Sequence, residues 1–97
     1  MATYIALTSY TDQGIRNVKD TVKRADAVKE AAKKFGCNFA QLYWTLGGYD
    51  LVGVIEAPDE SSATAFALAI GAQGNVRTQT LRAFSREEMT GIVGKLG

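Results

Sequence analysis

The chain has 97 residues, of which 46% are hydrophobic and 22% charged, and 11 Lys and Arg against 10 Asp and Glu leave a net charge of +1. This size and composition fit one globular domain, residues 1–97, and exclude disordered, collagen-like and coiled-coil classes. The near-neutral charge argues against nucleic acids and anionic membranes as partners, and the complete absence of His removes the most common general base and metal ligand.

Cysteine usage and the N-terminus point to a cellular compartment. The single Cys37 permits no intramolecular disulfide and no multi-thiolate metal site, so the sequence predicts neither a metal nor a cofactor. Residues 1–8 lack the basic start and the small-residue cleavage pattern of a signal peptide. No segment reaches the ~20 apolar residues of a membrane span. We therefore expect a cytoplasmic protein.

In chain order, the first two elements are a strand and a long helix. Residues 2–9 are apolar and β-prone and predict a strand with Ile5 and Leu7 on one face. After a break at 11–14, apolar residues recur at spacings of three and four, which predicts one amphipathic helix that ends at Gly36. The apolar stripe of this helix consists of Ile15, Val18, Val22, Ala25, Val28, Ala32 and Phe35.

A β-hairpin is predicted next. Residues 39–46 and 49–56 have strand character and flank Gly47-Gly48, a typical two-residue turn, which sets Trp44 opposite Leu51 and Thr45 opposite Asp50. One face of the hairpin then carries Leu42, Trp44, Leu46, Leu51 and Ile55. The other carries Phe39, Gln41, Tyr43, Thr45, Asp50, Val52, Val54 and Glu56. Neither face is plainly polar, so we expect both to be covered, one of them by a second molecule.

Three further elements complete the chain. A helix beginning near Pro58 has a core stripe that includes Phe66 and a second apolar stripe that includes Leu68. Residues 76–84 are more polar and predict an edge strand. Ser85 and Glu88 have the spacing of a capping box, which predicts a short final helix.

The element order β-α-β-β-α-β, followed by a short helix, is that of an α+β, ferredoxin-like fold with two helices on one face of a four-stranded antiparallel sheet. The topology leaves the second sheet face open, and an apolar open face indicates an interaction surface. Two such faces packed together would close a dimeric α/β barrel. Candidate interface residues are Phe39, Tyr43, Val52 and Val54 on this face, and Leu68 on the second helix.

Candidate ligand-binding residues lie in two segments. Tyr49 and Asp50 place a phenol and a carboxylate side by side after the Gly-Gly turn, where Asp50 faces Thr45. Arg24 borders the buried stripe of the first helix and can clamp a carboxylate or phosphate with its planar donors. Thr8, at the end of the first strand, is a further candidate contact. The alternative is that Asp50 and Thr45 only fix the hairpin, that Tyr49 packs, and that Arg24 is structural.

The string Leu42-Tyr43-Trp44-Thr45-Leu46-Gly47-Gly48-Tyr49-Asp50 resembles the GYD domain family, named for the last three residues. The opening segment 7–16 and the segments 23–25, 54–59 and 74–78 are similar too, so the resemblance covers about residues 3 to 84. It implies a small bacterial or archaeal protein with a ferredoxin-like fold of the dimeric α/β-barrel type. It implies no particular activity.

Three functions stay open at this point. The first is an oligomeric module that binds a small apolar or anionic ligand between its sheet and helices. The second is a cofactor-independent enzyme, similar to the monooxygenases and isomerases of the dimeric α/β-barrel type, which is an analogy of fold alone. Its base would have to be Asp50, Glu56 or a tyrosine, because the chain has no His. The third is a purely structural subunit of a homo-oligomer.

Overall fold

A four-stranded antiparallel sheet forms the centre of the computed structural model, which describes residues 1–97. The strand order β2-β3-β1-β4 is that of a ferredoxin-like fold and places β4 at an edge, which confirms both predictions. The strands are β1 (Ala2–Tyr10), β2 (Asn38–Trp44), β3 (Leu51–Ala57) and β4 (Val76–Ala83).

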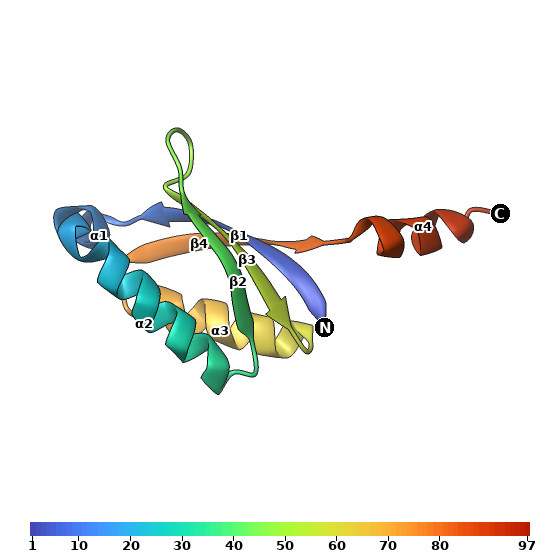
Figure 1. Ribbon diagram of the computed structural model, residues 1–97. Helices are drawn as coiled ribbons and strands as arrows, with labels where there is room; N and C mark the ends of the chain where they lie inside the picture. Colours follow the sequence, from blue (N-terminus) through green and yellow to red (C-terminus); the bar gives the residue numbers. More distant parts are fainter.

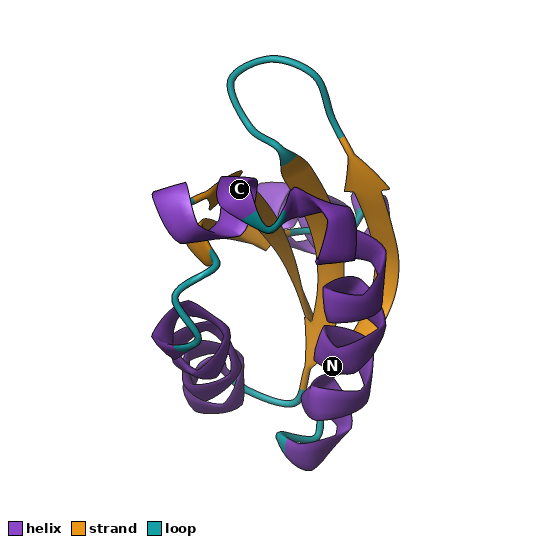
Figure 2. Cartoon of the chain, turned by 90° about the vertical axis from the view of Figure 1, so that its left-hand side faces the viewer, coloured by secondary structure: helices purple, strands orange, loops and turns teal.

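The helices form a second layer on one face of the sheet, and the other face is bare (Figures 1 and 2). α2 and α3 make this layer, whereas α4 lies apart beyond the end of β4. No helix combines the length and the apolar character that crossing a bilayer requires. The helical elements are α1 (Asp12–Arg16), the 3-10 turn η1 (Val18–Asp20), α2 (Thr21–Lys34), α3 (Glu60–Ala72) and α4 (Arg86–Gly94).

The prediction of one continuous first helix is wrong, because the chain leaves the helical path at Asn17. The Asn17 side chain and backbone N–H both donate to the carbonyl of Gln13, which ends α1. α1 is also tied by Thr11 to the loop before β4, so its axis is set separately from that of α2. As a result, Ile15 and Val22 of the predicted stripe are 52% and 58% exposed.

The core lies between the sheet and the C-terminal part of α2 together with α3. Phe66 is 1% exposed at its centre, and its ring centroid is 5.9 Å from that of Phe35 and 6.2 Å from that of Phe39. Cys37 is buried in the same cluster. Burial, and to a lesser degree the negative charge of Asp59, raises the pKa of the Cys37 thiol above its ordinary value.

The hairpin has the predicted register near its turn and a different one at its far end. Trp44 pairs with Leu51, and the Thr45 N–H donates to the Asp50 carbonyl, as expected. The strands stop earlier than predicted, so the connection is the six-residue loop 45–50. At the far end the register shifts between Phe39 and Gln41, a β-bulge.

This bulge corrects the position of Phe39, which was expected on the open face. Phe39 pairs with Ile55 and turns toward α3, where it packs on Phe66. The site for its ring exists because position 53 is glycine: a Cβ there would lie 2.6 Å from Phe39 Cζ. Tyr43, Val52 and Val54 do occupy the face opposite the helices.

α4 lies apart from the rest of the domain and is stabilised by a cap at its N-terminal end. Ser85 and Glu88 form the predicted capping box, with the Glu88 N–H donating to Ser85 Oγ and the Ser85 N–H donating to Glu88 Oε1. The backbone bond from Ser85, with help from Arg82 3.1 Å away, lowers the pKa of the Glu88 carboxyl. The helix extends a molecule that measures 52 × 30 × 17 Å (Figure 1).

Candidate functional site

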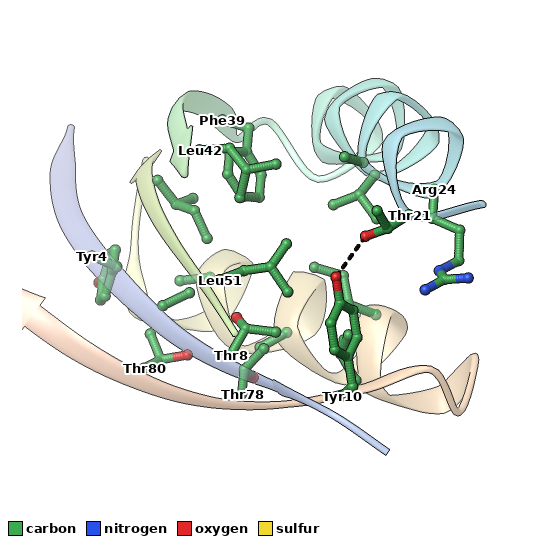
Figure 3. Close-up of a pocket in the computed structure, with 18 residues that line it drawn as sticks. Tyr4, Thr8, Tyr10, Thr21, Arg24, Phe39, Leu42, Leu51, Thr78 and Thr80 are labelled. Carbon is green, nitrogen blue, oxygen red and sulfur yellow. Dashed lines mark hydrogen bonds between the residues drawn. The ribbon is translucent and has the colours of Figure 1, made fainter. Parts of the chain in front are cut away.

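A cavity of about 80 Å³ lies between the sheet and the helices (Figure 3). Its walls are mainly apolar, since 13 of the 18 lining residues are hydrophobic, and they come from all four strands, α2 and α3. Period-two alternation in β1 turns Tyr4, Ala6, Thr8 and Tyr10 toward this space. The cavity is therefore formed by the core-facing side of the sheet and the two helices, and it is partly open to solvent.

Hydroxyl groups line the part of the cavity formed by β1 and β4. Thr8 pairs with Thr78, and Ala6 pairs with Thr80, so the two strands bring these threonines to one side. At the far end, Tyr10 Oη and Thr21 Oγ1 are 2.8 Å apart (Figure 3). Thr21 Oγ1 also accepts a bond from Trp44 Nε1 at 3.0 Å. These contacts join β1, the start of α2 and the hairpin.

Arg24 lies at the same end as Tyr10, as Figure 3 shows. Its Nη1 donates to the carbonyl of Asn17 at 2.6 Å and its Nη2 to that of Gly14 at 3.2 Å. The guanidinium thus binds two carbonyls at the C-terminal end of α1, of which that of Asn17 also accepts the Asp20 N–H. Arg24 forms no salt bridge with Asp50 or Glu56. Besides lining the cavity, it joins α2 to the end of α1 through its hydrogen bonds.

Tyr4 stands out among the cavity residues that sequence reasoning missed as ligand contacts. It is 5% exposed, and its hydroxyl is buried without any hydrogen-bond partner. The Arg82 guanidinium carbon lies 5.8 Å from the centre of its ring. The alternation of Tyr4 with Ala6 and Thr8 along β1 indicates that its side chain faces the helices. That its hydroxyl lacks a hydrogen-bond partner can be seen only in the tertiary structure.

The remaining candidates, Thr45, Tyr49 and Asp50, lie at the hairpin loop and do not line the cavity. Thr45 Oγ1 donates to the Tyr49 carbonyl at 2.6 Å, and Tyr49 Oη donates to Gln79 on β4 at 2.8 Å. Asp50 links the loop to β1: its N–H donates to the Thr8 carbonyl, and its Oδ2 accepts from the Tyr10 N–H, both at 2.8 Å. These contacts hold the loop together and attach it to β1 and β4.

An open groove of about 740 Å³ adjoins the cavity between α3 and β4. Tyr4, Ala63, Ala67, Thr78 and Thr80 line both spaces, so the groove offers a path from solvent to the cavity. Leu68, which is 69% exposed, borders the groove.

The side chains that line the cavity are mostly apolar or carry hydroxyls. The ionisable groups that line the cavity are the phenols of Tyr4 and Tyr10 and the guanidinium of Arg24, and no carboxylate lines it. In a pocket with apolar walls, a few hydroxyls orient a bound molecule and determine which of its polar atoms receive a hydrogen bond. The arrangement therefore suits the binding of a small molecule better than proton transfer.

Comparisons with known proteins agree with this fold. The model of the GYD domain family matches residues 4–93. A protein of Thermus thermophilus named "Glutamine synthetase and cystathionine beta-lyase binding protein" is 34% identical over 84 residues, which are 86% of this chain and 88% of that protein. A crystal structure of a protein from Thermus thermophilus is similar with a TM-score of 0.57 and 26% identity, and the match covers 88% of this chain and 95% of that one.

Proposed function

Because this chain belongs to the GYD domain family, we propose that it is a small binding module that docks on the surface of an enzyme through α4. The name of the Thermus relative, a binding protein for glutamine synthetase and cystathionine β-lyase, supports an enzyme as the partner. The likeness extends over most of both chains, so the relative is a single module of the same kind.

The observation that carries the proposal is the exposed apolar stripe of α4. Met89, Ile92 and Val93 of α4, and Leu96 in the turn that follows it, stand at positions i, i+3, i+4 and i+7 and are 44%, 37%, 53% and 83% exposed. This spacing is that of helices which lay one face into the groove of a partner. The capping box holds α4 in shape before any partner arrives, so less conformational entropy is lost on binding.

Replacing Ile92 by aspartate tests this docking. The change places a charge in the middle of the stripe, and we expect the affinity for the partner enzyme to fall about 30-fold or more, as for a central anchor residue. Biolayer interferometry against purified glutamine synthetase and cystathionine β-lyase measures the effect. Thr90→Asp is the matched control, because Thr90 is exposed on α4 outside the stripe. Equal affinities of the two variants would exclude α4 as the docking element.

We also propose that the open sheet face pairs with a second copy of the chain. Val52 and Val54 are half-buried there and Tyr43 is 58% exposed, beside Ile5 and Leu7 of β1. Covering such a face removes apolar surface from water, and a chain of 97 residues gains much from it. The exposed Leu68 on α3 is a candidate for a second contact that extends the dimer.

Native mass spectrometry tests the pairing. We expect a dimer for the wild type and a monomer for Val54→Lys, since two opposed lysines would have to be desolvated in the interface. Leu68→Arg should leave the dimer intact, because α3 lies on the other side of the sheet. A wild-type monomer, or a Val54→Lys dimer, would contradict the proposal.

A further inference from the structure

The Tyr4 hydroxyl lacks the hydrogen bond that its burial requires. Tyr4 is 5% exposed, and no donor or acceptor of the chain reaches its hydroxyl. Buried polar groups almost always have a partner, because an unpaired one loses its bonds to water without replacement. Phenylalanine would fill the same place without this penalty. The hydroxyl therefore has an unused donor and acceptor that a bound molecule can satisfy.

The space beside Tyr4 is suitable for that partner. The cavity of about 80 Å³ exceeds the roughly 30 Å³ that one water molecule occupies in the liquid. The adjoining groove shares Tyr4, Ala63 and Ala67 with the cavity, so a molecule can enter between α3 and β4 and lie partly in each space. Most of the surface it would meet is apolar, with Thr78 and Thr80 as further hydroxyls.

Charge at the site favours a neutral molecule. Arg24 is the only charged residue that lines the cavity, and it donates to the carbonyls of Gly14 and Asn17. Arg82 lies over the Tyr4 ring and is paired with Glu88. Neither cation is therefore free to balance an anion placed next to the Tyr4 hydroxyl, and the charged residues that line only the groove, Glu60 and Arg77, are exposed to solvent.

We propose that this cavity binds a small, uncharged and largely apolar molecule with one oxygen, such as a phenol or a short-chain ketone, and that Tyr4 Oη donates a hydrogen bond to that oxygen. The body of the molecule lies against α3 at Ala63 and Ala67. This binding site is on the helix side of the sheet and shares no residue with the apolar stripe of α4. It is therefore independent of the docking proposed above.

Phenol and toluene are suitable probes, because they differ only in a hydroxyl or a methyl on the same ring. Each is titrated into isotope-labelled protein, and NMR follows the methyl groups of Leu51, Ile55 and Ile70, which line the cavity. We expect Tyr4→Phe to weaken phenol binding about tenfold, the equivalent of one hydrogen bond of about 1.4 kcal/mol. Toluene binding should be unchanged, and Tyr4→Phe should unfold at a temperature equal to or higher than that of the wild type.

A second pair of variants tests the location. Ala67→Leu fills the space that the cavity and groove share and should abolish the binding of both probes, whereas Ala65→Leu changes an exposed position of the same helix and should leave it intact. Equal phenol affinities of wild type and Tyr4→Phe would overturn the role of the hydroxyl. If neither probe shifts the lining methyl groups of the wild type, the cavity holds only water and the proposal is wrong.

Discussion

Truncating Phe66 to alanine is expected to lower the free energy of unfolding by about 3–5 kcal/mol. The ring is 1% exposed and is in contact with the rings of Phe35 and Phe39, so its removal leaves a void between α3 and the sheet. Domains of ordinary stability have a free energy of unfolding of about 5–15 kcal/mol. This domain already contains a cavity beside its core. A domain at the lower end of this range would be partly unfolded at 37 °C after such a loss.

Urea unfolding, followed by Trp44 fluorescence and by circular dichroism, measures this loss. Leu68→Ala is the matched control, because it removes an apolar side chain of the same helix that is 69% exposed. The control should change the stability by less than about 0.5 kcal/mol. A loss below about 1 kcal/mol for Phe66→Ala would mean that α3 does not pack on the sheet as described.

The second large effect is expected at Gly14, which has the least room for a side chain among the glycines of the chain. A Cβ added to Gly14 would lie 1.9 Å from the carbonyl oxygen of Asn75, so α1 and the loop before β4 would have to separate. The hydrogen bond from the Thr11 N–H to the Asn75 carbonyl, 3.1 Å long, would be lost with it. We expect Gly14→Ala to destabilise the fold by about 2–3 kcal/mol.

Gly91→Ala is the appropriate control for Gly14→Ala. A Cβ at position 91 meets nothing within 4 Å, and alanine favours a helix over glycine, so this variant should be as stable as the wild type or slightly more so. Thermal unfolding compares the two. NMR shifts of Tyr10 and Arg24 should change in Gly14→Ala alone, because Arg24 Nη2 donates to the Gly14 carbonyl. Equal stability of both variants would contradict the close approach.

The architecture could be predicted because the pattern of each element agreed with the fold as a whole. Gly47-Gly48 fixed the register around Trp44 correctly, since the pairing next to a turn depends on local sequence. Phe39 was misplaced because a bulge shifts strand parity by one residue, and its cause is the space above Gly53 on the neighbouring strand.

The candidate site could be predicted only in part. Thr8 and Arg24 do line the cavity, because strand alternation and helix periodicity determine which way they point. The helix break at Asn17 was missed because the apolar spacing continues through it. Tyr4 was missed for a different reason: an unpaired hydroxyl appears only when every possible partner has been placed in three dimensions.

Because α4 has its own cap and lies outside the core, its residues and the core residues are subject to different constraints. The core residues around Phe66 must keep their volumes for the chain to fold, whereas Met89, Ile92 and Val93 contribute little to that folding. Substitutions in α4 that preserve Ser85 and Glu88 can therefore accumulate at almost no thermodynamic penalty. On the docking proposed above, a change of partner would require changes in this one short segment and none in the residues that form the core.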